Sequence, residues 1–238
     1  MKSFLATKQR FREPEIMDDP VLDGSRHAVA LRGLSRLNYL SRSAQILWSP
    51  LTVLARQLGR RQLLVLDVAT GAGDVPVRLW HIAQRAGIDL EILGLDVSPR
   101  AVEFAAAQAA AKKAAINFRV LDVLAGPLPE GFDVVTSSLF LHHLAEKQGV
   151  LLLQAMANAT KHIVLVNDLR RSATGLALAH LAAWTLGGSD VVRVDGARSV
   201  RAAFRVCEAA ALAQAAGLKG TIVEPCWPFR FLLTWQRS

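Results

Sequence analysis

The sequence contains only two cysteines, Cys207 and Cys226, and they belong to no Cys-x-x-Cys or Cys/His pattern. This spacing suits reduced thiols of a cytoplasmic protein better than a disulfide or a zinc site, so we expect no metal centre. The sequence also lacks a secretory signal and an apolar run long enough to span a bilayer, since His180 interrupts the longest candidate at 175–188. We therefore expect no membrane insertion, while peripheral association stays open.

Proline and glycine are sparse, with 9 and 16 residues among 238, whereas 52% of the residues are hydrophobic and 20% are charged. This composition excludes fibrous and largely disordered proteins, and the length fits one large α/β domain. The net charge of +8 would favour anionic partners such as nucleic acid, coenzyme A thioesters or a membrane surface. Because the basic residues are dispersed, we expect most of them on a solvated face.

Short apolar runs rich in β-branched residues alternate with helical patterns along most of the chain. The expected strands are 62–68, 90–97, 116–123, 132–140 and 162–169. This alternation predicts an α/β fold with a doubly wound, Rossmann-like and mostly parallel sheet. Two further strands around Pro228 predict an antiparallel C-terminal hairpin, which makes seven strands in total.

The flanking segments differ in character from this core. Residues 1–60 are expected to form an N-terminal arm and a helical cap, because apolar residues recur at helical spacing over 27–51 and the pattern stops at Pro50. Residues 61–238 are expected to form the sheet domain, with a lid insertion at about 172–200. Within that insertion, 189–199 is expected to be extended or looped, and a helix is expected over 200–217.

The first indication of a functional site lies at the ends of the expected strands. Asp67 ends the first expected strand, and Gly71 and Gly73 lie in the turn that follows it, where glycine lets the backbone approach a ligand closely. The next two strands end in Asp96 and Asp122. Because the carboxyl ends of strands in a doubly wound sheet line one crevice, these groups should face the same nucleotide-like cofactor.

The ordered phrases "LDVATGAGD", "LDVSP", "VLDV" and "FDVVTSSLFLHHL" resemble the motifs of the class I S-adenosylmethionine (SAM)-dependent methyltransferases. The resemblance runs from about Arg61 to the C-terminus, and "RLNYLSRS" is similar to the segment before the core in quinone-biosynthesis methyltransferases. It implies a methyltransferase catalytic domain at 61–238, with SAM as cofactor and S-adenosylhomocysteine (SAH) as product.

The resemblance also implies roles for single residues. The two glycines would approach the methionyl part of SAM, Asp96 would bind the ribose hydroxyls, and Asp122 would bind the adenine amino group. Asp67 would orient the loop and, through water, the ammonium group. The cofactor site expected in this way consists of Asp67, Gly71, Gly73, Asp96, Val97, Asp122, Val123 and Ser137.

Two adjacent histidines, His142 and His143, follow the fourth expected strand, and Asp168 ends the fifth. If these strands are neighbours, one histidine and the aspartate meet over the methyl group as a base and its orienting partner. A neutral histidine can accept the proton of a phenol-like hydroxyl. Residues expected to contact the acceptor or form its lid are Asn38, Arg42, Arg170, Arg171 and Arg193.

Several alternatives stay open at this point. A nicotinamide-dependent dehydrogenase is disfavoured because Pro76 stands where the dinucleotide pattern has a third small residue. A nucleic-acid methyltransferase is disfavoured because "TSSLF" replaces an Asn/Asp-Pro-Pro-aromatic phrase, and a non-catalytic SAM-binding protein would not need the histidines. We expect O-methylation of a small, largely apolar phenolic, quinol or polyketide-like acceptor. Carbon methylation of a similar ring is the nearest alternative, and the oligomeric state stays open.

Overall fold

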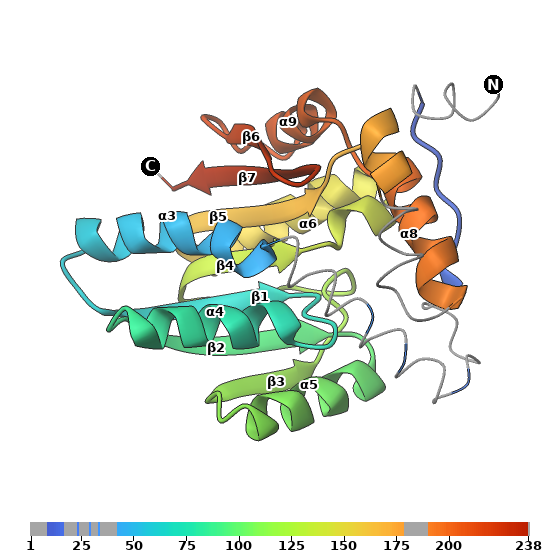
Figure 1. The fold of residues 1–238 in the computed structure, drawn as a ribbon. Helices are drawn as coiled ribbons and strands as arrows, with labels where there is room; N and C mark the ends of the chain where they lie inside the picture. The colour runs from blue at the N-terminus through green and yellow to red at the C-terminus, as the bar shows by residue number, and fades with distance from the viewer. Residues whose placement is uncertain are drawn as a thin grey trace.

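The computed structural model describes residues 9–16, 23, 29, 33, 42–178 and 190–237. Its centre is a seven-stranded sheet in the order β3-β2-β1-β4-β5-β7-β6 (Figure 1). The strands are β1 (Gln62–Val68), β2 (Asp89–Asp96), β3 (Ile116–Val120), β4 (Phe132–Ser138), β5 (Thr160–Leu169), β6 (Ile222–Cys226) and β7 (Arg230–Gln236). Strands β1 to β5 are parallel, whereas β7 pairs antiparallel with both β5 and β6. The predicted seven-stranded, Rossmann-like fold is therefore confirmed.

Helices cover both faces of this sheet. They are α3 (Ser43–Gln57), α4 (Asp74–Arg85), α5 (Pro99–Ala111), α6 (Glu146–Ala159), α8 (Asp190–Ala202) and α9 (Val206–Ala215), with a 3-10 turn, η2 (Leu141–His143). One apolar cluster packs α3 and α4 against one face, and another packs α6 and α9 against the opposite face. None of the helices in the described part of the chain is long and apolar enough to cross a membrane.

The helix α3 corrects one expectation, since it continues through Pro50 instead of stopping there. Its buried residues, Leu47, Leu51 and Leu54, lie on both sides of the proline and belong to the α3/α4 core cluster. Burial of this apolar face compensates for the hydrogen bond that proline removes. Most of the preceding cap segment, including Asn38, lies outside the described residues.

The helix α8 corrects a second expectation, because residues 189–199 were predicted to be extended or looped. The buried residues Val191, Val192, Asp195 and Ser199 recur at helical spacing, so packing on one face outweighs the low helix propensity of valine. The helix predicted over 200–217 is interrupted between Ala202 and Val206, where α8 ends and α9 begins. The division into a cap at 1–60 and a domain at 61–238 stays a prediction.

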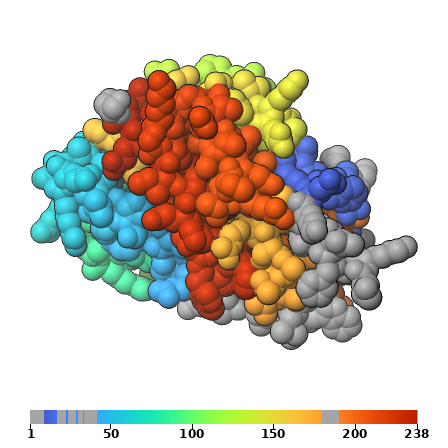
Figure 2. All heavy atoms as spheres, turned by 90° about the horizontal axis from the view of Figure 1, so that it is seen from above, coloured from blue at the N-terminus to red at the C-terminus, as the bar shows by residue number. Residues whose placement is uncertain are grey.

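One further segment lies near the carboxyl ends of the parallel strands. Residues 9–16 run beside α8 at that edge of the molecule (Figure 1). In the space-filling view, dark blue atoms of this segment lie on the surface next to yellow atoms of the α6 region (Figure 2). A backbone hydrogen bond of 3.2 Å from the Phe11 nitrogen to the Arg201 oxygen joins the segment to α8. Parts of the chain that are distant in sequence thus meet at the edge where the predicted site lies.

Candidate active site

The carboxylate of Asp67 is buried at the end of β1. It accepts hydrogen bonds from the hydroxyls of Thr70 (2.8 Å) and Thr136 (2.6 Å). Its pKa is raised to about 6, mainly by burial and also by the nearby charges of Asp74 and Asp96, although the hydrogen bonds from the two hydroxyls oppose the shift. Because ionisation of a buried carboxylate is costly, a positively charged ligand would stabilise the ionised form of Asp67.

The glycine loop and the end of β2 are joined through Asp96. One carboxylate oxygen of Asp96 accepts the backbone N–H of Gly71 at 2.8 Å, and the other accepts that of Ser98 at 2.9 Å. Gly71 and Gly73 have φ angles of 55° and 73°, in the left-handed region where glycine is unstrained. A side chain at Gly73 would also collide with Ala105, because a Cβ atom there would lie 2.8 Å from the Ala105 Cβ. The loop therefore lies beside Asp67 and Asp96, as the sequence predicted.

The other predicted cofactor residues lie in different surroundings. Strand β3 ends at Val120, so Asp122 is exposed in the loop beyond the strand and is not at its tip. Val97 is 63% exposed, and Val123 is buried in the core. Ser137 is fully buried and donates a hydrogen bond of 3.0 Å to the Val68 carbonyl, which makes it part of the sheet interior. Their binding of a cofactor stays a prediction.

His142 and Asp168 form a buried pair, as predicted. The Nδ1 atom of His142 lies 2.7 Å from Asp168 Oδ1, and the His142 backbone N–H donates to Asp168 Oδ2 at 3.0 Å. Burial alone would raise the pKa of Asp168, but the charge and hydrogen bonds of His142 and the Leu169 backbone N–H lower it below its usual value. An ionised Asp168 accepts a hydrogen bond from Nδ1–H, which keeps the proton on Nδ1 and leaves a lone pair on Nε2 for a proton-transfer role.

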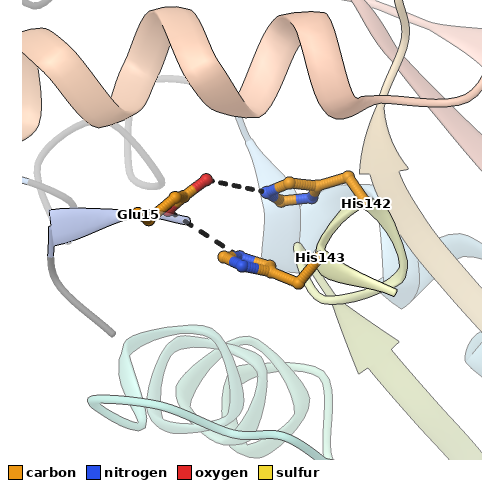
Figure 3. A group of neighbouring side chains, drawn as sticks. All are labelled: Glu15, His142 and His143. Carbon is orange, nitrogen blue, oxygen red and sulfur yellow. Dashed lines mark ion pairs between the residues drawn. The ribbon is translucent and has the colours of Figure 1, made fainter. Parts of the chain in front are cut away.

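The structure adds Glu15, which the sequence analysis did not single out (Figure 3). Its Oε1 atom lies 3.8 Å from His142 Nε2, and its Oε2 atom lies 3.9 Å from His143 Nε2. All three side chains offer metal-ligand atoms within 4.8 Å of one another. Ligand atoms around an ion at about 2.1 Å in tetrahedral geometry would be only about 3.4 Å apart. The three side chains are therefore not closed around an ion in this arrangement.

The predicted acceptor and lid residues divide into separate groups. Arg171 is buried and donates to the Ala203 carbonyl and to Glu208, each at 2.6 Å, which ties its guanidinium to the start of α9. Arg170 is partly buried, and its Nε atom makes no hydrogen bond within the described part of the chain. Arg42 is the left-handed residue before α3, and Arg193 is exposed on α8.

Arg230 is a second residue that the sequence analysis missed. It begins β7, opposite Leu169 at the end of β5, and it is buried. Burial lowers its pKa to about 10, against the opposing effects of the Asp168 and Asp74 carboxylates. The positive charge of Arg230 thus lies within electrostatic reach of the His142–Asp168 pair. No sequence motif marked it, because its position depends on the pairing of β7 with β5.

Comparisons with known proteins agree with this geometry. A family model described as a methyltransferase domain matches residues 65–162. The demethylmenaquinone methyltransferase of Deinococcus radiodurans is 36% identical over 93 residues, which are 39% of this chain and 37% of that protein. The enzyme of the same name from Thermus thermophilus is 33% identical over 104 residues, which are 42% of this chain and 46% of that protein. The matched stretch thus spans less than half the length of either curated relative.

The fold is also found among solved structures. The plantazolicin methyltransferase BamL, solved in complex with a triazolic desmethylPZN analog and SAH, superposes with a TM-score of 0.68. It is 15% identical, and the match covers 88% of this chain and 89% of that one. At this identity the likeness shows the fold alone. The segment that carries the glycine loop and both histidines is thus the part that the methyltransferase-domain model matches, and the predicted resemblance to SAM-dependent methyltransferases is confirmed.

Proposed function

We propose that this protein transfers the methyl group of SAM to a hydroxyl of a small, largely apolar acceptor of the phenolic, quinol or polyketide type. The observation that carries the proposal is the buried His142–Asp168 pair, with a 2.7 Å contact, at the carboxyl ends of β4 and β5, where β4 is the neighbour of the glycine-loop strand β1. A cytoplasmic location stays a prediction from the sequence.

The residues at the tips of β1 and β2 fit the proposed cofactor. SAM carries a sulfonium and an ammonium group, and the buried Asp67 carboxylate, with its pKa raised to about 6, would gain a compensating positive charge from them. Asp96 would hold the ribose while it fixes Gly71, and Asp122 would hold the adenine. When bound, SAM supplies an electrophilic methyl group.

The residues around His142 would supply the remaining chemistry. His142 Nε2 would take the proton of the acceptor hydroxyl, while Asp168 keeps the ring oriented and stabilises the imidazolium that forms. A positioned base of this kind contributes on the order of 100- to 10,000-fold. The surrounding elements, including α8 and residues 9–16, would orient the acceptor and exclude water.

Carbon methylation of a quinol ring is the second candidate. It is favoured by the two curated relatives, both of which are named demethylmenaquinone methyltransferases. The same base could remove a hydroxyl proton and so activate the ring carbon next to it. The two reactions differ in product, because only O-methylation removes a titratable hydroxyl.

Labelled SAM and a panel of phenols, resorcinols and quinols test the proposal, with products identified by mass spectrometry and NMR. We expect transfer by the wild-type protein, loss of transfer with intact SAM binding in His142→Ala, and unchanged transfer in His162→Gln. His162 is a matched control on β5, where its ring faces Asp133, well away from Asp168 at the carboxyl end of the strand. Robust labelling of RNA or DNA, or equal transfer by His142→Ala, would contradict it.

A further inference from the structure

The segment 9–16 is held in place by an arginine that reaches three neighbouring elements. Arg10 donates to the Ala202 carbonyl at 2.6 Å and to the carbonyls of His142 and Leu144 at 2.8 and 2.7 Å. Its guanidinium also lies 3.6 Å from the ring centroid of Phe204. Because a guanidinium presents its donors in a fixed fork, these contacts define the position of the segment relative to the histidine turn.

Three further contacts fasten the same segment to α8. The Ile16 backbone N–H donates to Asp195 at 2.9 Å, and Arg198 donates to the Pro14 carbonyl at 2.7 Å. The Ser199 hydroxyl donates to Glu15 Oε1 at 2.5 Å. The Glu15 carboxylate is therefore placed by contacts on both sides of it in the sequence and by a hydrogen bond to its own oxygen.

The two oxygens of Glu15 face two different imidazoles. Oε1 lies 3.8 Å from His142 Nε2 and Oε2 lies 3.9 Å from His143 Nε2, so the carboxylate lies beside the two packed rings and faces both of them (Figure 3). The exposed fractions of the side chains rise along this path, from 3% for His142 and 9% for Glu15 to 25% for His143. The three groups thus lead from a buried base to the surface.

A buried base needs such a path. Methyl transfer to a hydroxyl releases one proton for each acceptor methylated, and the proton stays on His142 Nε2 until it reaches solvent. During the reaction, a bound acceptor and the residues that exclude water would block the direct route of the proton from His142 Nε2 to solvent. The gaps of 3.8 and 3.9 Å are too long for direct hydrogen bonds, but each can be closed by one water molecule or by a small side-chain movement.

We propose that Glu15 carries the proton from His142 to His143, which releases it to solvent. In this sequence the O–H bond of the acceptor breaks and an N–H bond forms on His142 Nε2. The N–H bond on His142 then breaks as an O–H bond forms on Glu15 Oε1, and the carboxyl group turns so that this oxygen faces His143. There the O–H bond breaks, an N–H bond forms on His143 Nε2, and the carboxylate is restored. No oxidation or reduction is involved. Glu15 acts through His142 and not on the acceptor, and this role rests on the proposed function.

The charges around His142 fix the sign of the expected pH effect. Asp168 faces its Nδ1 atom from β5, Glu15 faces its Nε2 atom, and His143 packs with a ring centroid 4.3 Å away. Two cations also lie nearby, since Arg10 is bound to the His142 carbonyl and the buried Arg230 interacts electrostatically with Asp168. A negative Glu15 favours the imidazolium form, so its removal should make His142 a weaker base.

The test compares Glu15→Gln with Glu224→Gln, a matched control on the exposed side of β6. In Glu15→Gln we expect kcat to fall on the order of tenfold or more, SAM affinity to stay unchanged by calorimetry, and the acidic limb of the pH–rate profile to move to lower pH. Glu224→Gln should match the wild type. In Glu15→Ala, added formate should restore part of the rate, while the wild type should not respond.

A purely structural role for Glu15 would lower kcat without a shift of the pH profile and without rescue by formate, and this result would overturn the proposal. Loss of wild-type activity on chelation, restored by Zn²⁺ or Co²⁺, would instead assign the three side chains to a metal ion and would overturn it too. If the wild type transfers no methyl group to any acceptor, the proposed function fails first. If the wild type is active and Glu15→Gln is equally active, only the proposed proton transfer through Glu15 is contradicted.

Discussion

The substitution Asp168→Asn tests the role of the His142–Asp168 pair with almost no change in the shape of the side chain. Asp168 accepts from His142 Nδ1 at 2.7 Å, from the His142 backbone N–H at 3.0 Å and from the Leu169 backbone N–H at 2.6 Å. An asparagine oxygen in the place of Oδ2 keeps the contact with the His142 backbone N–H, but the NH₂ group then takes the place of Oδ1 and faces both Nδ1 and the Leu169 N–H. Nδ1 must become an acceptor, so the proton moves to Nε2, and Nε2 can no longer take a proton from the acceptor.

The expected loss in kcat is on the order of 100- to 10,000-fold, which corresponds to about 3 to 5 kcal/mol of activation free energy. The assay is the initial rate of methyl transfer at saturating SAM, with SAM affinity measured by calorimetry and folding by the melting temperature. SAM affinity should be retained, because Asp168 lies on β5 and the glycine loop follows β1. A variant that keeps more than half of the wild-type kcat, with His162→Gln as control, would refute the role of the pair.

The remaining predictions concern the cofactor end of the site. Asp96→Ala should weaken SAM binding at least tenfold in calorimetry, and intact binding would contradict its assignment. The pKa of Asp67 is raised to about 6 in the folded state, so the protein without ligand should lose stability as pH rises from about 4 to 7, by about 3 kcal/mol. Asp67→Asn should flatten this slope in urea unfolding and be the more stable protein at pH 7.5, whereas an unchanged slope would contradict the assignment. Gly73→Ala should destabilise by about 3 kcal/mol and Gly71→Ala by about 1, because only Gly73 adds a collision to its positive φ. Equal values in urea unfolding would argue against this packing.

The sheet and the glycine-loop end of the site could be predicted because the signals are local. A buried apolar strand, a glycine turn and a helix start occupy consecutive residues, and parallel strands bring their carboxyl ends to one edge. Asp67 and Asp96 were placed in this way, and the Gly71–Asp96 hydrogen bond confirms that β1 and β2 meet there. The His142–Asp168 contact followed from the same rule applied to the neighbours β4 and β5.

Features that depend on tertiary packing could not be predicted from local sequence patterns. Glu15 lies in a segment with no clear periodicity, and its position depends on the docking of Arg10 and on contacts from α8. The helix α8 was predicted wrongly because valine and glycine favour other conformations, and only burial of one face decides in favour of the helix. Asp122 lies beyond the end of β3 because the strand is shorter than its apolar pattern suggested.

A crystal structure of the protein with SAH tests the central claim most directly, since that claim concerns where the cofactor lies. The account predicts the ribose hydroxyls on the Asp96 carboxylate, the amino acid end beside Gly71 and Asp67, and the sulfur directed toward His142 Nε2. Bound SAH at another edge of the sheet, or a sulfur facing away from His142, would contradict it.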